Sequence, residues 1–233
     1  MKDYIKTSAE RALKNRNEYH LITENVSLYI IEKFPPHINI NKVLKLIKKE
    51  IPSVMLNVID GIYVGEFKEL KNRNIQAMFK DRAIYISCFR NNPHVSEELI
   101  VGDICHELGH GMENEFGRQI YSDGKIESEY NGKKKKLFSL LKFDGHNISS
   151  NLFFSDNNIE EFDNFLFNDL TYDKLSSYLA GLFTSPYSVT SIREYFANGL
   201  EDYLLGDREY LKKISPSLYK KINTLYKEIT GES

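Results

Sequence analysis

The chain has 233 residues, of which 41% are hydrophobic and 27% are charged, and its formal net charge is −2. Such a length and apolar content allow one large hydrophobic core or two smaller lobes. The small net charge argues against a general affinity for nucleic acid or for an anionic membrane surface, and no apolar run approaches the roughly 20 residues that span a bilayer.

The N-terminal residues 1–33 are predicted to be helical. They begin with a polar, amphipathic stretch and lack the uninterrupted apolar core of a secretory signal. We therefore expect a cytoplasmic protein as the sequence is written, and a secreted or delivered effector if a leader has been removed. The following FPPH, Phe34–His37, predicts a rigid connector, and KVLKLIKKEI from Lys42 predicts a helix that ends at Pro52.

The next segments predict a small sheet. Val58–Leu70 has glycines beside short apolar runs and is typical of a strand with turns. Apolar residues alternate with polar ones over Ile75–Phe79, and Lys80–Arg82 predicts a turn. The segment Ala83–Phe89 is rich in β-branched and aromatic residues and predicts a second strand.

The predicted strand that begins at Ala83 runs into the loop before a histidine-containing helix. An open sheet edge at this place could bind an extended peptide by strand addition. We therefore expect a protein or peptide substrate to bind in extended form along residues 83–88. The alternative is that these residues form an ordinary internal strand.

The stretch from Ser96 to Gly111, SEELIVGDICHELGHG, predicts a helix with two histidines on one face. Ser96 is a suitable N-cap, and apolar residues recur after it at helical spacing. Because positions i and i+4 share a helix face, His106 and His110 can bind one metal ion. The intervening Glu107 can then reach a water on that ion. This is the HExxH arrangement of zinc hydrolases; the alternative is a buried helix whose histidines form hydrogen bonds within the core.

The two cysteines, Cys88 and Cys105, cannot form a disulfide framework for a chain of this length, and both are expected to be small apolar residues. Adjacent helix residues point about 100° apart, so Cys105 cannot readily share an ion with His106. A closed, structural zinc site would require a fourth ligand. Cys105, His94 and His146 are the non-carboxylate options, and no spacing favours any of them.

The region after the motif is polar and then aromatic. Lys133–Lys136 lies in YNGKKKKLF, which predicts a solvated loop; a role in steering substrate is the alternative. Residues 152–183 combine aromatic and acidic residues at near-helical spacing. They predict two or three helices packed over the core, which could also form a wall of a substrate cleft.

A catalytic zinc usually has three protein ligands and one open position. In the HExxHxxGxxH variant the third ligand would be residue 116, which is Phe116, so this variant is excluded. A carboxylate from a helix downstream is the remaining choice. Glu113 would point away from the ion, and Glu127 and Glu129 are expected in a loop that cannot hold them in place. The candidates are Glu113, Glu127, Glu129, Glu160, Glu161, Glu194 and Glu201.

The best candidate is Glu194, in SPYSVTSIREYFANGLEDYLLG. Proline ends the preceding segment, Thr190 or Ser191 can act as N-cap, and a helix is predicted to run to Gly206. A helix can bury its apolar stripe on one side and present a ligand from the other. The alternative is that Glu194 serves only as the third residue of a capping box on Ser191.

The motif at residues 106–110, followed at a distance by Glu194 in EYFA with Tyr187 seven residues before it, resembles the anthrax lethal factor-type zinc peptidases. These are gluzincin-like zincins and include the proline–proline endopeptidases. The strand AIYIS followed by HELGHG is also similar to the edge strand and active-site helix of that family. The resemblance covers roughly residues 50–112 and 184–220. It implies that Glu194 is the third zinc ligand and that Tyr187 stabilises the oxyanion.

Two features depart from the family pattern. The distance along the chain from His110 to Glu194 is long, so residues 114–183 are expected to be an insertion that reshapes the cleft. Gluzincins also often carry an acid one turn beyond the ligand glutamate, and that position is Asn198 here. An amide oxygen can accept the imidazole N–H but increases the basicity of the ligand less than a carboxylate does.

The fold class expected from these features is α+β and zincin-like. We expect a small mixed sheet with an edge strand plus an active-site helix, and a mainly helical C-terminal lobe. Residues 1–113 would form the N-terminal lobe with the sheet and the HExxH helix. Residues 114–183 would form a largely helical insertion that shapes the cleft, and residues 184–233 would carry the third zinc ligand.

The function expected is that of a zinc-dependent metalloendopeptidase. One Zn²⁺ ion would be held by His106, His110 and Glu194. Glu107 would act as general base, and Tyr187 would donate to the oxyanion. The alternative is a catalytically silent zincin-fold protein with a binding or regulatory role.

Overall fold

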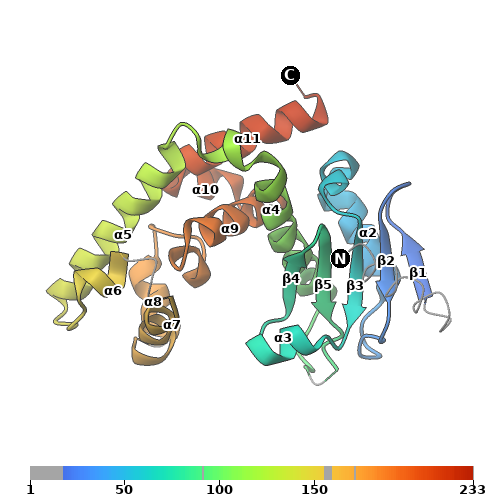
Figure 1. Ribbon diagram of the computed structural model, residues 1–233, viewed down its shortest axis with the longest axis horizontal. Coiled ribbons are helices and arrows are strands. Elements are labelled where there is room, and N and C mark those ends of the chain that lie inside the picture. The colour runs from blue at the N-terminus through green and yellow to red at the C-terminus, as the bar shows by residue number, and fades with distance from the viewer. Residues whose placement is uncertain (1–17, 91, 155–158, 171, 233) are drawn as a thin grey trace. The chain divides into compact units, whose positions relative to one another are not determined.

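Figure 1 shows the computed structural model, which describes residues 18–90, 92–154, 159–170 and 172–232. The chain divides into two compact units, Met1–Met112 and Glu113–Ser233. The boundary falls within one long helix, α4 (Glu97–Tyr121). A mixed sheet belongs to the first unit, whereas the described part of the second is helical, so the class is α+β as the sequence predicts.

The first unit contains a five-stranded mixed sheet with the strand order β1-β2-β3-β5-β4. The inner pairs β2–β3 and β3–β5 are parallel, and the outer pairs β1–β2 and β4–β5 are antiparallel. The strands are β1 (Glu18–Leu21), β2 (Ser27–Ile30), β3 (Gly61–Gly65), β4 (Ala77–Lys80) and β5 (Ala83–Ser87).

The helices of the first unit supply its hydrophobic core together with the sheet. Asn39 caps α2 by accepting from two backbone N–H groups, and the helix ends before Pro52 as predicted. Its Val43 and Ile47 are fully buried, like the branched side chains of the inner strands. The elements are α2 (Ile40–Glu50), a 3-10 helix (Ser53–Val58), α3 (Lys68–Arg73) and the first part of α4.

A row of aromatic side chains crosses the sheet. Tyr19, Tyr29, Tyr63 and Tyr85 occupy paired positions on β1, β2, β3 and β5, and successive rings are stacked 6.3, 5.0 and 5.5 Å apart. Met78 continues the row on β4 opposite Tyr85. Such cross-strand contacts define the register, because a slip of one residue would move every ring to the other face.

Strands β4 and β5 form a tight hairpin. Asp81 and Arg82 form its turn with φ of 50° and 60°, the left-handed conformation that type I′ turns require. The flanking Lys80 and Ala83 are therefore a hydrogen-bonded pair, and pairs with and without bonds alternate from there. The turn that the sequence predicts at residues 80–82 is confirmed.

This alternation determines which backbone groups of β4 point away from the sheet. Gln76 lies in a bonded pair, since its carbonyl accepts from the Ser87 N–H at 2.7 Å. Bonded pairs recur at every second residue, so Met78 also bonds to β5. Ala77 and Phe79 lie between the bonded positions and direct their N–H and C=O groups outward. The outer edge of the hairpin therefore belongs to β4.

The interpretation of residues 83–89 as an edge strand is wrong. β5 lies between β3 and β4 and is paired on both sides. The sequence pattern of an edge strand and of an internal strand can be the same, since only the pairing of distant segments determines position in a sheet. The hairpin places the short β4 at the edge instead.

The prediction of a helix over residues 1–33 is wrong for the described part of that range, and residues 1–17 lie outside the described residues. β1 and β2 form an antiparallel pair joined by a short turn, in which the Ile22 N–H donates to the Val26 carbonyl at 2.9 Å. Stacking of Tyr19 and Tyr29 along the tyrosine row is a tertiary contact that local periodicity does not contain.

The second unit consists of helices over its described residues. After α4, the described residues form one long α-helix, three short α-helices and a π-helix before a 3-10 turn, and three more α-helices after it. The elements after α4 are α5 (Lys125–Phe143), α6 (Ser150–Phe154), α7 (Ile159–Asn164), a π-helix (Phe165–Asp169), α8 (Tyr172–Leu179), a 3-10 helix (Pro186–Val189), α9 (Ile192–Leu205), α10 (Arg208–Ile214) and α11 (Pro216–Thr230). The helices predicted within residues 152–183 are thereby confirmed.

Two expectations about residues 125–136 are wrong, because this segment belongs to α5 rather than to loops. Glu129 is held firmly: its carboxylate accepts from the N–H groups of Ser217 and Leu218 at 2.7 and 3.0 Å and from the Tyr195 hydroxyl at 2.9 Å. Glu129 therefore caps the N-terminus of α11, where backbone N–H groups lack helical partners.

The lysine run is not a solvated loop, because Lys133 and Lys134 are buried. The Lys133 ammonium donates to the Ser215 hydroxyl at 2.5 Å and lies 4.9 Å from the centre of the Tyr195 ring. Long side chains of this type can bury their aliphatic stems beneath aromatic rings. Four consecutive lysines suggest solvent exposure, but helical geometry directs two of them into the unit.

We expect a pH-dependent stability from Lys133. Burial lowers the pKa of its ammonium from 10.5 to about 8, so the unfolded chain binds more protons between these values and stability rises with pH there. The free energy of unfolding from urea titrations should increase by about 1 kcal/mol between about pH 7 and about pH 9. Lys133→Met should lack this increase, and an unchanged increase in that variant would contradict the assignment.

Candidate metal centre

The helix that carries the candidate site begins as the sequence predicts. The Ser96 hydroxyl accepts from the Leu99 N–H at 3.2 Å, as an N-cap does. Glu97 and Glu98 lie in the first turn, and both carboxylates bind the Lys42 ammonium, at 3.2 and 2.8 Å. Acidic residues are favoured at this end of a helix because its dipole is positive there.

Within α4, His106, Glu107 and His110 form a compact group. One ligand atom of each lies within 4.8 Å of those of the others. The two imidazole rings have centroids 5.1 Å apart and planes at 81°, so both can direct a nitrogen toward one ion. Glu107 is 8% exposed and the two histidines are half-buried. Solvent can reach the histidines, which argues against a sealed core helix.

This donor set fits a zinc ion. Two imidazoles and a nearby carboxylate are ligand types that zinc accepts, and the spacing along α4 places the imidazoles one turn apart. Another group in the described residues, Glu32, Glu66 and Cys88, has ligand atoms at similar distances. The structure therefore offers two groups that could hold a metal.

The second group is explained by ion pairs, and the sequence pattern did not reveal it. Arg90 binds Glu32 at 2.6 Å, and Lys71 binds Glu66. The Lys71 ammonium holds the pKa of the Glu66 carboxyl below its usual value, whereas burial raises the pKa of the Cys88 thiol. Lys71 and Arg90 thus neutralise the two acids, which weakens the attraction of this group for a metal ion.

Glycine allows α4 to pack closely on the sheet. A Cβ atom at Gly111 would lie 3.1 Å from a methyl group of Val58 and 3.2 Å from the Phe79 ring. The helix does not end here, and it continues to Tyr121. Close packing at Gly111 brings the preceding turn, which carries Glu107, against β4.

The Glu107 carboxylate binds the edge strand. Its Oε2 accepts from the backbone N–H of Phe79 at 2.5 Å. A buried carboxylate requires such hydrogen bonds because its removal from water is costly. Position 79 is one of the two outward-facing positions of β4, so this N–H is available without loss of a bond to β5.

Both free cysteines are fully buried, as expected for small apolar residues. Neither Cys88 nor Cys105 is in a disulfide. Cys105 does not belong to the candidate metal group that contains its neighbour His106. The two thiols are therefore part of the core of the first unit.

In the second unit, Glu194 lies in the first turn of α9, and the Ser191 hydroxyl accepts from its N–H at 3.1 Å. This half of the predicted capping arrangement is confirmed. The adjacent Arg193 donates to Glu113 Oε2 at 2.7 Å, and the Tyr121 hydroxyl donates to Glu113 Oε1 at 2.7 Å. Glu113 is thus engaged by two donors within this unit.

The environment of Glu194 contains another acid and an amide. Burial and the charge of Glu194 raise the pKa of Asp163 above its usual value. The Asn198 side chain donates its N–H to the Glu194 carbonyl at 2.8 Å. The side-chain NH₂ group of Asn198 therefore forms a hydrogen bond within its own helix, which the sequence did not indicate.

Tyr187 is 54% exposed and lies in the 3-10 helix Pro186–Val189. The Ser185 hydroxyl caps this turn by accepting from the Tyr187 N–H at 3.2 Å, and the Tyr187 ring lies 5.2 Å from that of Phe167. An exposed phenol on a short, capped turn can donate its hydroxyl hydrogen to a ligand.

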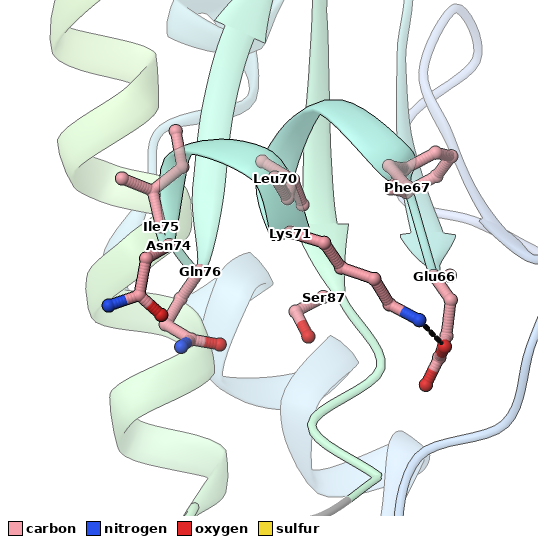
Figure 2. A pocket seen from close by; sticks show the side chains of 9 residues that line it. Glu66, Phe67, Leu70, Lys71, Asn74, Ile75, Gln76 and Ser87 are labelled. Atoms are coloured by element: carbon pink, nitrogen blue, oxygen red, sulfur yellow. Dashed lines mark hydrogen bonds and ion pairs between the residues drawn. The ribbon is translucent and has the colours of Figure 1, made fainter.

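The first unit contains a cavity of about 130 Å³, beside α3 and the carboxyl ends of β3 and β5. Figure 2 shows the side chains that line it. Its rim carries the Lys71–Glu66 ion pair, drawn as a dashed line. The side chains around it are mostly polar and include none of the three residues of the candidate metal centre. Its lining residues are Gly65, Glu66, Phe67, Leu70, Lys71, Asn74, Ile75, Gln76 and Ser87.

Comparisons of the chain with protein-family models, with curated proteins and with solved structures find no match. None of the helices in the part of the chain that the structure describes has the length and apolar character needed to cross a bilayer. The candidate site therefore rests on its own geometry and chemistry.

We expect Glu113 to stabilise the second unit. Removing its carboxylate by Glu113→Ala deprives the Tyr121 hydroxyl and the Arg193 guanidinium of their common acceptor, which should lower the free energy of unfolding by about 1–3 kcal/mol. Asn114→Ala, at an exposed position of the same helix, should have little effect. Urea denaturation of the two variants measures the difference, and equal stabilities would refute the assignment.

Proposed function

We propose that this protein is a zinc-dependent metalloendopeptidase with a zincin-like fold that cleaves an extended protein or peptide segment. The observation that carries the proposal is the group formed by His106, Glu107 and His110 on one helix, with the carboxylate bound to a sheet edge. Two histidines four residues apart on a helix, with a glutamate after the first, are the zinc ligands and the general base of HExxH metallohydrolases.

His106 and His110 would hold the ion, and Glu194 would complete the set of protein ligands. A zinc ion supplies Lewis acidity toward a carbonyl oxygen and lowers the pKa of water to about 7. Glu194 lies in the first turn of a capped helix, and the Ser191 hydroxyl accepts from its backbone N–H. The choice of Glu194 rests on the sequence pattern, in which it follows the two histidines as a carboxylate on a separate helix.

The side chains of the protein would then carry out the proton transfers. Glu107 would take a proton from water and deliver it to the leaving amine. Tyr187 would donate its hydroxyl hydrogen to the developing oxyanion, a kind of contact that is often worth ~2.7–4 kcal/mol. Its exposure and its place on a capped turn are compatible with this role.

The substrate would bind along β4, because residues 83–88 are internal to the sheet. On the outer side of β4, Ala77 offers both N–H and C=O, and Phe79 offers C=O. Adding a strand at this edge would align an extended peptide by main-chain hydrogen bonds. This edge strand has four residues, so pockets for the substrate side chains would contribute to the selection of sequence.

The general base is tested by Glu107→Gln, which removes the basic oxygen and preserves the shape of the side chain. We expect zinc content to be retained and turnover of a peptide library to fall by at least about 10²-fold. Glu98→Gln, in the exposed first turn of α4, is a matched control that should keep its turnover. Cleavage by Glu107→Gln at the wild-type rate would refute the assigned base.

The ligand set is tested by metal analysis after dialysis. The wild-type protein should bind about one zinc ion, and His106→Ala or His110→Ala should abolish binding. Glu194→Ala should weaken zinc binding by at least about tenfold, whereas Glu201→Ala, on the same helix, should not. Equal affinities of these two glutamate variants would exclude Glu194 as a ligand.

A further inference from the structure

The edge strand and the candidate general base are in direct contact. Phe79 donates its backbone N–H to Glu107 Oε2 at 2.5 Å, a short distance for a bond from an amide to a carboxylate. Glu107 is buried and lies on α4, whereas Phe79 lies on β4. The bond therefore joins two elements that the chain connects only through β5 and the following loop.

The geometry of the hairpin makes this N–H available. In the bonded pairs of β4 and β5, the N–H of Met78 is directed at Tyr85. Phe79 belongs to the alternate set, so its N–H points outward and its bond to Glu107 costs the sheet nothing. The type I′ turn at residues 81–82 determines this parity, because it fixes Lys80 and Ala83 as a bonded pair.

We infer that β4 is a positioning element for Glu107 and that the backbone N–H of Phe79 orients the carboxylate for proton transfer. This inference rests on the proposed function for its catalytic consequence, but the bond itself does not. A carboxylate on a flexible side chain has several rotamers, and a fixed donor selects one of them. Selecting the productive orientation in advance lowers the barrier to the reaction.

The same bond restricts how a substrate can use the edge. A peptide strand beside β4 can form both main-chain bonds at Ala77, but at Phe79 it can bind only the carbonyl, because the N–H is occupied. The carbonyl of the substrate residue opposite Phe79 is therefore left without a partner from the strand. If the other main-chain groups of the substrate that face β4 are hydrogen-bonded to it, the carbonyl of the substrate residue opposite Phe79 is the one available for another interaction.

The hydrogen bond from Phe79 to Glu107 can be tested without an activity assay, by measuring amide hydrogen exchange of the purified protein by NMR. We expect the Phe79 amide to exchange slowly, like that of Met78, whereas the outward Ala77 amide exchanges fast. Glu107→Ala should accelerate exchange at Phe79 by at least about tenfold and leave Met78 unchanged. Exchange at Phe79 that is as fast as at Ala77 in the wild type, or is insensitive to Glu107→Ala, would overturn the inference.

The positioning role is tested by comparing Phe79→Pro with Phe79→Ala. Both variants remove the ring, but only proline removes the N–H, and proline is tolerated on an edge strand where the N–H faces away from the sheet. When both variants have zinc bound and the substrate is a peptide that the wild-type protein cleaves, kcat of Phe79→Pro should lie at least about tenfold below that of Phe79→Ala. KM and zinc content should differ little between the two. Equal kcat values would refute the role.

The outcomes separate this inference from the proposed function. If wild-type protein binds no zinc and cleaves no peptide while the exchange pattern holds, the peptidase assignment fails and the contact between strand and carboxylate stands. If peptides are cleaved and the two variants at position 79 have the same kcat, the positioning role fails and the peptidase assignment stands. Circular dichroism and the chemical shifts of β5 establish that Phe79→Pro keeps the fold.

Discussion

The contact between α4 and β4 is the constraint on which the candidate site depends. A buried carboxylate is stable only with hydrogen bonds, and the Phe79 N–H supplies one to Glu107. This donor exists because β4 is an edge strand with a defined register, and the approach is close because residue 111 is glycine. Glu107 as the proposed base, the edge proposed to bind a peptide and the helix with both imidazoles are thus parts of one packed arrangement.

Carboxylates have a similar structural role in the second unit. Glu129 on α5 caps α11 and also binds Tyr195 on α9, so one side chain connects three helices. Glu113 binds Arg193 and thereby holds the start of α9, the helix that carries Glu194. Glu113 is buried and Glu129 is half-buried, and each carboxylate is matched by donors at a helix terminus or by a guanidinium.

Local patterns were sufficient wherever a single segment determines its own structure. The hairpin turn at residues 80–82, the N-cap at Ser96 and the cap at Ser191 are all present. Predictions were wrong where a distant partner decides. β1 and β2 are strands because they extend a sheet, and Lys133 is buried because α5 directs it beneath aromatic rings of the unit. The charge and periodicity of one segment do not predict which distant strands or aromatic rings it will contact.

The sequence by itself determined the grouping of the two imidazoles in the candidate centre, because the HExxH spacing on a helix places them on one face whatever surrounds them. The tertiary structure alone decided which strand is the edge and which backbone group meets Glu107. The physical reason is that strand order and hydrogen-bond parity arise from pairing between segments distant along the chain. No residue encodes that pairing in its own neighbourhood, whereas helix spacing is local.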